Sequence, residues 1–230
     1  MRWPPWSPVT FLARRNRFAC SALLPDGSEV LLHLPNSGRL AELLLPGTRG
    51  AAAPSSRPRH TWGDLLALHP GDFWVVVDAR LPPLLLLEGL SRGKTPELGS
   101  PAAAREAQRE VLLGESRVDL FLPSERLYVE TKSVTLAREG RALFPDAPTL
   151  RGRRHLRELR LALSRGFRAA VAFVVQRPDA CLFACHASVD PAFCQELALF
   201  SREGGETYAY ACVTREGEVS LLHRLPVEMP

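Results

Sequence analysis

The segment from Arg168 to Gln176 restricts the fold more than any other part of the sequence, because its seven inner residues, Ala169 to Val175, are all apolar. A strand with one exposed face alternates apolar and polar residues, whereas this segment has no polar face. It therefore predicts a strand within a sheet that is covered on both sides. Helical patterns precede it at Leu150 to Ser164 and follow it from the N-cap Asp190 to about Arg202, so a mixed α/β fold is indicated.

The rest of the second half alternates extended and helical segments in the same way. Ala102 to Leu113 is expected to begin as a helix, and Leu84 to Leu90 to be a short buried helix or a linker. Further strands are predicted at Val118 to Leu122, Leu127 to Lys132, Thr207 to Val213 and Val219 to Leu225, the last two joined at Glu216-Gly217. Residues 81–230 are therefore predicted to form one α/β domain.

The N-terminal part of the chain has a different character, since short extended segments alternate with turn signals. Phe11 to Leu24 is strand-like and returns, after a turn, through Val30 to Leu34. Asp72 to Asp78 is predicted to be an apolar strand, and the small, prolyl and basic stretch from Ala51 to Arg59 is expected to be an exposed loop. Several strands in so short a span predict a small β-barrel, formed by residues 1–80.

The distribution of positive charge indicates an anionic partner. The net charge of +4 says little by itself. From Met1 to Cys20, however, there are four arginines and no acid, and from Arg138 to Arg168 there are nine arginines against three acids. Clusters of this kind are typical of proteins that bind a phosphate backbone. The alternative is a solvated basic face without a partner.

The sequence also gives expectations for the cellular compartment and for the redox state of the cysteines. It has no apolar run long enough to cross a bilayer, and Met1 to Ala13 carries three prolines and makes a poor secretory signal, so a cytoplasmic location is expected. Five cysteines at irregular spacing predict reduced thiols rather than a disulfide framework. Zinc is a less favoured alternative, because the two-residue gap typical of zinc knuckles is missing from Cys181, Cys185, His186 and Cys194.

The strongest chemical signal is a hairpin predicted from two strands and the Pro-Ser-Glu-Arg turn between them. Centring that turn places Asp119 directly opposite Glu130, and opposed residues of an antiparallel pair share a face. Lys132 emerges on the same face, two residues beyond Glu130. The alternative to a functional cluster is a surface cross-strand ion pair. The residues expected on the other face are Val118, Leu120, Leu122, Val129 and Thr131.

This combination of charges predicts a divalent cation. Two adjacent carboxylates repel, and one takes up a proton unless a cation separates them. Mg²⁺ prefers hard oxygen ligands and usually takes one or two carboxylates together with substrate phosphate. Lys132 would orient a water molecule or stabilise charge on the phosphate. Only Lys94 and Lys132 among the 29 basic residues are lysines, so an ammonium at this position is consistent with a specific role.

The helix predicted at Leu150 to Ser164 is a second basic element. Thr149 is its expected N-cap, and a helix N-terminus can hold a phosphate. The arginines beside its apolar face would track a phosphodiester backbone, or the helix is simply amphipathic. His155 is interpreted as structural. The apolar face consists of Leu156, Leu159 and Leu163, and the arginines along its border are Arg153, Arg157 and Arg160.

Five ordered stretches resemble the bacterial sugar fermentation stimulation protein family, over nearly the whole chain. They are RRNRF (14–18), HLPNSGRL (33–40), REVLLGESRVD (109–119), YVETKSVTL (128–136) and FPDAPTLRGRRHLREL (144–159). The resemblance implies an N-terminal OB-like barrel followed by an α/β domain of the PD-(D/E)xK nuclease type. It also implies DNA binding without strong sequence preference and a regulatory role in sugar metabolism, for which the residues themselves give no support.

The resemblance also assigns roles to individual residues. Asp119, Glu130 and Lys132 occupy the nuclease-like positions, and Glu110 matches an upstream acidic position that would help to hold the metal. Mg²⁺ is the expected cofactor, and Mn²⁺ is expected to substitute. The loop from Val77 to Pro83 departs from the asparagine-rich family pattern, so no role is transferred to it. Nucleic-acid contacts are expected from Arg14, Arg15, Arg17, Phe18, Arg117, Arg151, Arg153 and Arg157.

Three functions remain open at this stage. The first is a DNA-binding protein with little sequence preference that is also a metal-dependent endonuclease. The second is a non-catalytic DNA-binding regulatory factor whose nuclease site is vestigial. The third is an RNA-processing factor, because a barrel joined to a nuclease-like core does not distinguish RNA from DNA. No membrane partner is expected, and the sequence leaves the oligomeric state open.

Overall fold

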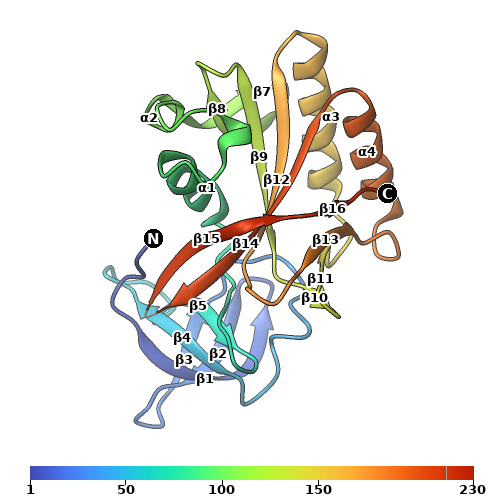
Figure 1. Cartoon of the computed structure of the whole chain (residues 1–230). Helices are drawn as coiled ribbons and strands as arrows, with labels where there is room; N and C mark the ends of the chain where they lie inside the picture. Colours follow the sequence, from blue (N-terminus) through green and yellow to red (C-terminus); the bar gives the residue numbers. More distant parts are fainter. Residues whose placement is uncertain (216) are drawn as a thin grey trace.

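The computed structural model describes residues 1–215 and 217–230. Its first part is a closed β-barrel, drawn from blue to cyan in Figure 1. The strands pair in the order β3-β2-β1-β4-β5-β6, and β3 also pairs with β5, which closes the barrel. The predicted small barrel is therefore confirmed. The strands are β1 (Ser7–Asn16), β2 (Ala19–Leu23), β3 (Glu29–His33), β4 (Arg49–Pro54), β5 (Gly63–His69) and β6 (Val75–Val76).

Two expectations for the barrel are only partly correct. Residues 56–59 are exposed and lie outside the strands, as expected, but the first residues of Ala51 to Arg59 belong to β4, where Ala51 and Ala52 are fully buried. Alanine side chains are small enough to fit where barrel strands pack closely. The composition of this segment, taken alone, nevertheless resembles that of a loop. The strand expected at Asp72 to Asp78 is reduced to Val75–Val76, and the flanking residues leave the sheet.

The second part is an α/β domain built on a sheet with the strand order β15-β14-β12-β9-β8-β7. Strand β12 runs parallel to both neighbours, β9 and β14, and its residues Ala169 to Val175 are fully buried, as the sequence predicts. A smaller sheet has the order β10-β11-β13-β16. The strands are β7 (Gln108–Leu113), β8 (Ser116–Leu122), β9 (Leu127–Val134), β10 (Ala137–Arg138), β11 (Arg141–Phe144), β12 (Arg168–Val175), β13 (Leu182–Cys185), β14 (Glu206–Arg215), β15 (Glu218–Leu225) and β16 (Val227–Glu228).

Helices cover both faces of the larger sheet (Figure 1). On one face lie α1 (Pro82–Ser91), the 3-10 helix η1 (Pro96–Leu98) and α2 (Ala103–Glu106), and on the other α3 (Leu150–Ser164) and α4 (Pro191–Arg202). The predicted N-caps are confirmed, since Thr149 accepts a hydrogen bond from the amide of Gly152, and Asp190 from that of Phe193. None of the described helices is long and apolar enough to cross a membrane. The cytoplasmic location stays a prediction.

The structure differs from, or does not describe, three features that the sequence predicted for the second part. Helix α2 ends at Glu106, and the rest of Ala102 to Leu113 forms β7, because pairing with β8 overrides the helix-like spacing of Glu106 and Glu110. The cysteines are not all reduced, since Cys185 and Cys194 form a disulfide between β13 and α4. The turn predicted at Glu216-Gly217 includes residue 216, which lies outside the described residues.

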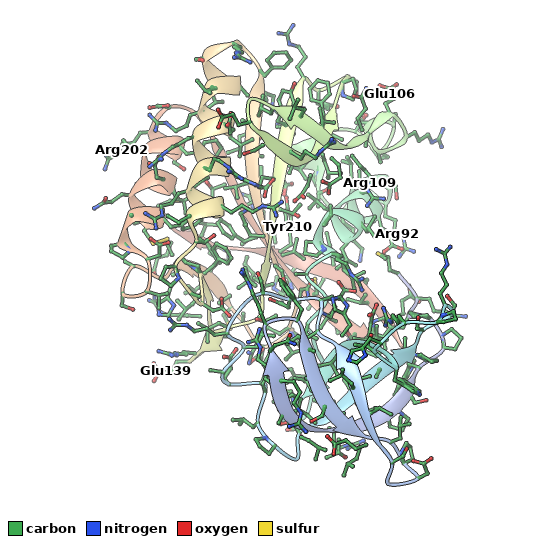
Figure 2. All side chains as sticks on the ribbon, turned by 180° about the vertical axis from the view of Figure 1, so that it is seen from behind. Arg92, Glu106, Arg109, Glu139, Arg202 and Tyr210 are labelled. Carbon is green, nitrogen blue, oxygen red and sulfur yellow. A yellow bond between two sulfur atoms is a disulfide. The ribbon has the colours of Figure 1, made fainter. Side chains whose placement is uncertain are left out.

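The barrel and the α/β domain share a packed junction, which Figure 2 shows filled with side chains. One core combines Trp3, Ala53 and Leu66 of the first part with Leu86 and Leu221 of the second. Backbone and side chain both cross the junction: the amide of Val76 donates to the carbonyl of Gln176, and Gln176 Nε2 donates to the carbonyl of Val76. This packing fixes the walls of the cleft that lies between the two parts.

Candidate active site

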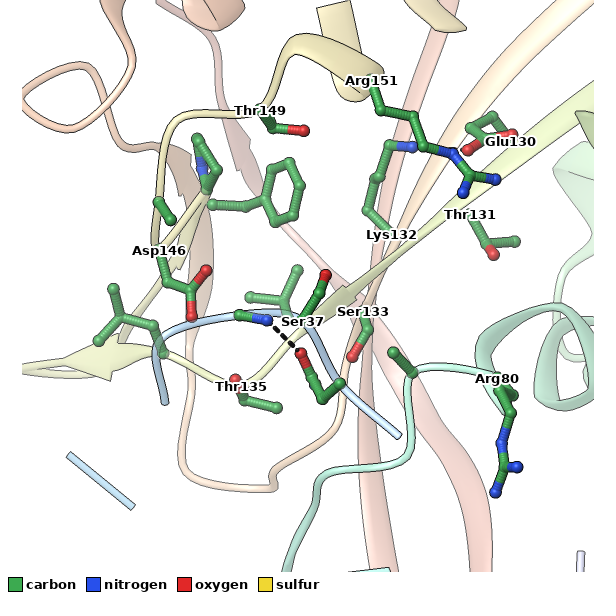
Figure 3. A pocket seen from close by; sticks show the side chains of 18 of the residues that line it. Ser37, Arg80, Glu130, Thr131, Lys132, Ser133, Thr135, Asp146, Thr149 and Arg151 are labelled. Atoms are coloured by element: carbon green, nitrogen blue, oxygen red, sulfur yellow. Dashed lines mark hydrogen bonds and ion pairs between the residues drawn. The ribbon is translucent and has the colours of Figure 1, made fainter. Parts of the chain in front are cut away.

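A cleft of about 530 Å³ lies where the barrel meets the edge of the larger sheet (Figure 3). Its floor is the second half of β9, from Glu130 to Val134. One wall is the loop from Asn36 to Gly38 of the barrel, and the other is the segment from Phe144 to Thr149 that leads into α3. The cleft therefore gathers residues from several distant stretches of sequence.

Asp119 lies at the point where the sheet opens beside this cleft. The predicted hairpin register is confirmed, since Leu120 pairs with Val129, but the ladder between β8 and β9 stops there. Beyond it, Asp119 Oδ2 accepts hydrogen bonds from the amide of Thr131 at 2.7 Å and from Thr131 Oγ1 at 2.5 Å. The expectation that Thr131 points away is wrong, because the separating strands no longer impose a strict alternation of faces. The carboxylate of Asp119 thus accepts the hydrogen bond from the Thr131 amide that a backbone carbonyl of a paired strand would otherwise accept.

Glu130 is the most deeply buried charged group of the cleft, with 3% of its surface exposed. Its Oε1 accepts a hydrogen bond from Lys132 Nζ at 2.5 Å and another from His155 Nδ1. Its Oε2 is buried and has no hydrogen-bond partner among the described residues. The predicted grouping of Asp119, Glu130 and Lys132 is therefore present, with one carboxylate oxygen left unsatisfied.

The two carboxylates affect each other's ionisation. Burial, and then the nearby charge of Glu130, raise the pKa of Asp119 to about 6. Burial also opposes ionisation of Glu130, but Lys132 and His155 outweigh it and lower the pKa of Glu130. Glu130 is thus an anion at neutral pH, and a second anion beside it is disfavoured unless a cation is present.

His155, interpreted as structural from the sequence, belongs to this site. It is buried on α3, and Arg151 Nε donates a hydrogen bond to its Nε2 at 3.2 Å. Because Nε2 is the acceptor, the ring hydrogen is assigned to Nδ1, which donates to Glu130. The four-residue spacing of Arg151 and His155 places them on one helix face. The contact with Glu130, by contrast, depends on how α3 packs on β9.

Glu110 lines the cleft but is exposed to solvent. It is exposed on β7 with φ of 53°, and the β7–β8 register places it opposite Asp119 without a ladder pair there. Across residues 1–215 and 217–230, no three His, Cys, Asp or Glu side chains form a group that could hold a metal ion by themselves. Any cation at Asp119 and Glu130 must therefore complete its coordination with other ligands.

The residues expected to contact nucleic acid divide into two sets. Arg17 and Arg151 line the cleft, and Phe18 lines a hollow that adjoins it. Arg14 donates to the carbonyls of Gly38 and Arg39, and Arg15 pairs with Glu29 on the barrel surface. Neither Arg14 nor Arg15 lines the cleft, and the role that the structure gives to Arg14 is to stabilise the loop at Gly38 and Arg39. Arg117 donates to the carbonyl of Glu110 and supports the rim.

The arginine border of α3 does not face the cleft. Arg157 pairs with Glu196 of α4 at 2.6 Å, and Arg160 pairs with Glu196 and Glu203. Arg153 lies 3.6 Å from Asp190, the N-cap of α4. These contacts stabilise the packing of α3 against α4, so the cleft gives no support to the prediction that these arginines track a phosphate backbone.

The loop from the barrel is tied to the opposite wall by residues that carry the family resemblance but to which the sequence assigned no role. Asp146 Oδ2 accepts a hydrogen bond from the amide of Leu40 at 3.2 Å. Asn36 is buried, donates to the carbonyl of Val77 and accepts from the amide of Gly38. A Cβ at Gly38 would lie 2.6 Å from Asp146 Oδ2, so glycine is required by the close approach of the two walls. These contacts explain why an Asn-Ser-Gly turn occurs at this position.

Comparison with known proteins gives a consistent picture over the whole chain. A family model described as the SfsA N-terminal OB domain matches residues 12–77, and one described as the sugar fermentation stimulation protein RE domain matches residues 80–218. Sugar fermentation stimulation protein homologs from Moorella thermoacetica and Natranaerobius thermophilus are 41% and 43% identical, and the matches cover 96% and 94% of this chain and 96% and 92% of theirs.

A solved structure agrees with these sequence matches. It is the structure of Pyrococcus furiosus SfsA in complex with Ca²⁺, and its sequence is 28% identical to this chain. It superposes with a TM-score of 0.89 over 99% of this chain and 98% of the other. The chain described here belongs to the sugar fermentation stimulation protein family.

Proposed function

We propose that this protein binds DNA with little sequence preference and hydrolyses its phosphodiester bonds with a divalent cation, Mg²⁺ or Mn²⁺, held by Asp119 and Glu130. The observation that carries the proposal is the buried Glu130 Oε2, which has no hydrogen-bond partner within the described part of the chain. An unpaired buried polar atom costs about 1–3 kcal/mol, and more when it is charged. A cation beside Oε2 would remove that cost and the repulsion from Asp119.

The donor set fits a hard cation. Two carboxylates supply oxygen ligands, and Mg²⁺ commonly takes no more than two from a protein, with water and substrate phosphate completing its shell. Among the residues that the structure describes, no group of three His, Cys, Asp or Glu side chains surrounds a single point, which agrees with a site that uses only two carboxylates. The Pyrococcus furiosus SfsA structure is a complex with Ca²⁺, a cation that also prefers oxygen ligands. We therefore infer a divalent-cation site in this chain as well.

The residues of the cleft have distinct roles in this proposal. A bound cation supplies a Lewis acid and lowers the pKa of a coordinated water. Lys132, held by Glu130, places an ammonium where charge develops on the phosphate. Thr131 holds the carboxylate of Asp119 in place, and His155 does the same for Glu130. Arg151 and Arg17 offer guanidinium groups to the phosphates next to the reacting one.

Weak sequence preference follows from the kind of group that lines the cleft. Guanidinium and ammonium groups bind phosphate oxygens, which are the same at every position of a strand. The lining of the cleft includes Arg17, Arg80, Arg109, Lys132 and Arg151. Binding is therefore expected to fall steeply with salt and to change little with sequence.

Incubation of supercoiled plasmid with Mg²⁺, Mn²⁺ or EDTA tests the activity. Wild type is expected to nick the plasmid only with a divalent cation, and Glu130→Gln, Asp119→Asn and Lys132→Met to be at least about 100-fold slower. Glu106→Gln, an exposed acid on α2 outside the cleft, is the matched control and is expected to be as active as wild type. Nicking at equal rates by wild type and Glu130→Gln would contradict the proposal.

Two alternatives are separated by the same samples. If plasmid is bound but not cut under any cation, the protein is a non-catalytic DNA-binding factor whose cation site is structural. If a matched RNA competes for binding at lower concentration than DNA and is cut in its place, the protein is an RNA-processing factor. The geometry of the cleft favours a nuclease over a non-catalytic DNA-binding factor. Lys132 and the two carboxylates, Asp119 and Glu130, line the same cleft as the guanidinium groups proposed to bind phosphate.

A further inference from the structure

A second hollow of about 770 Å³ opens beside the catalytic cleft and shares several residues with it. One side is formed by the tight turn between β1 and β2, with Arg17 and Phe18, and by His33 at the end of β3. The opposite side is the start of α3, from Pro148 to Gly152. Lys132 and Arg151 line both spaces, so the hollow continues directly into the cleft.

Phe18 is exposed although its backbone is firmly held. Its amide donates to Asn16 Oδ1 at 2.8 Å, and its carbonyl accepts from the amide of Leu34 at 2.8 Å. Its surface is nevertheless 47% exposed, and across the hollow Leu150 is 76% exposed. The Arg17 guanidinium lies 5.3 Å from the Phe18 ring centre. A rigid aromatic ring that is left in water beside a guanidinium is a suitable surface for a planar apolar group.

The charge around this ring has one sign. Four basic residues line the hollow, and no acidic residue does so among those that the structure describes. Arg80 is already paired with Asp78 and Asp64. For Arg17 and Arg151, within residues 1–215 and 217–230, no acidic partner is found. An exposed aromatic ring flanked by guanidinium groups without acidic partners matches a nucleic acid strand, which is a chain of planar bases joined by phosphates.

We propose that this hollow holds an unpaired nucleotide of the nucleic acid whose backbone enters the catalytic cleft, so that the preferred substrate is a single strand or a duplex with an unpaired end. The inference rests on the proposed function for the identity of the cleft. A base can stack on Phe18 only if its face is free, whereas the bases of an intact duplex present only their edges. Phosphates on either side of the stacked base lie near Arg17 and Arg151, and the strand continues toward Lys132.

The proposal is tested by binding in EDTA, which needs no cation and no cleavage. Fluorescence anisotropy is measured with a labelled DNA strand of about 20 nucleotides, long enough to span one binding site, and with a blunt-ended duplex of that strand and its complement. Phe18→Ala is expected to weaken binding of the single strand by roughly tenfold or more and that of the duplex by less than about twofold. Phe18→Trp keeps an aromatic face and is expected to retain single-strand affinity. Leu161→Ala removes an equally exposed apolar side chain, also 47% exposed, on the same helix as Arg151 but outside the hollow, and is the control.

A stacking signature separates this site from a structural effect of the substitution. A strand that carries 2-aminopurine is expected to lose fluorescence when bound to wild type or Phe18→Trp, and to keep it with Phe18→Ala. Equal losses for single strand and duplex, or unchanged quenching in Phe18→Ala, would overturn the proposal. Because no cation is present, this result does not depend on plasmid cleavage, so failure of the stacking proposal is distinguishable from failure of the nuclease proposal.

Discussion

His155 and Glu130 are separated by 25 positions in the chain, yet Nδ1 of the histidine is bonded to Oε1 of the carboxylate inside the protein. With Lys132 on the same oxygen, both donors hold Oε1, and Oε2 is the atom left for a cation. Arg151 sets the hydrogen of His155 on the nitrogen that faces Glu130. His155 therefore holds Glu130, the proposed cation ligand, in position without itself contacting the cation or the substrate.

Replacing His155 should weaken cation binding. His155→Leu removes the donor to Glu130 and leaves that carboxylate free to turn, and loss of a partner of this kind commonly lowers metal affinity by about 10- to 100-fold. Isothermal titration with Mn²⁺ measures the affinity, while DNA binding in EDTA should stay within about threefold of wild type. The exposed His223→Ala on β15 is the matched control. An unchanged Mn²⁺ affinity in His155→Leu would refute a positioning role.

Arg151 and Arg157 should behave differently although they lie on one helix. Arg151→Ala removes a guanidinium from the cleft, so DNA binding should weaken and the slope of log K against log salt should decrease by about 1. Arg157→Ala breaks an ion pair with Glu196 and should leave that slope unchanged. Salt titrations by fluorescence anisotropy give both slopes. A slope lowered equally in both variants would show that Arg157 also contacts the backbone, and an unchanged slope in Arg151→Ala would contradict a phosphate contact by Arg151.

Asp119 should make the cation-free protein less stable as pH rises. Its pKa of about 6 lies above the ordinary value of 3.8, so between these values the folded state holds a proton that the unfolded state releases. Stability from this group is full below about pH 4 and is lost as pH rises through about 6. Asp119→Asn removes the effect and should gain up to about 3 kcal/mol over wild type at about pH 8, with little gain at about pH 4.

Urea unfolding in EDTA at about pH 4, 6 and 8 measures this difference. The exposed Asp72→Asn is the control, and its difference from wild type should not vary with pH. A constant difference between Asp119→Asn and wild type across the three pH values would show that Asp119 is not destabilised by burial and by Glu130.

Thiol reactivity should distinguish the cysteines. Cys181 is exposed, whereas burial raises the pKa of Cys20 to about 11 and that of Cys212 to about 12. Iodoacetamide at about pH 8 should therefore alkylate the native protein at Cys181 alone, since the thiolate is the reactive form. Unfolding without reductant should expose the three free thiols, and reduction all five. Peptide mass spectrometry that finds native adducts at Cys185 or Cys194 would contradict the disulfide.

The parts of the site that depend on local rules could be predicted from the sequence. Turn chemistry and the pairing rule gave the register of β8 and β9, and N-cap preferences gave the first residues of α3 and α4. That register predicted Asp119, Glu130 and Lys132 on one face, although the ladder itself ends at Leu120 and Val129. The strand opening at Asp119, which turns Thr131 toward the carboxylate, breaks the alternation on which such predictions rest.

The parts that depend on packing between distant elements could not be predicted in this way. Nothing in the sequence near His155 indicates that α3 places it over Glu130, and nothing near Arg157 indicates that Glu196 of α4 faces it. The contact between Leu40 and Asp146 joins the barrel to the α/β domain across 106 positions. The buried alanines of β4 resemble a loop in composition and become a strand only when the barrel closes around them.

The most direct test of the central claim is anomalous diffraction from crystals soaked in Mn²⁺. We expect one strong peak in the cleft, next to Glu130 Oε2 and the carboxylate of Asp119, and its loss in crystals of Glu130→Gln. A peak at other residues, or an unchanged peak in the variant, would contradict a cation site built from these two carboxylates.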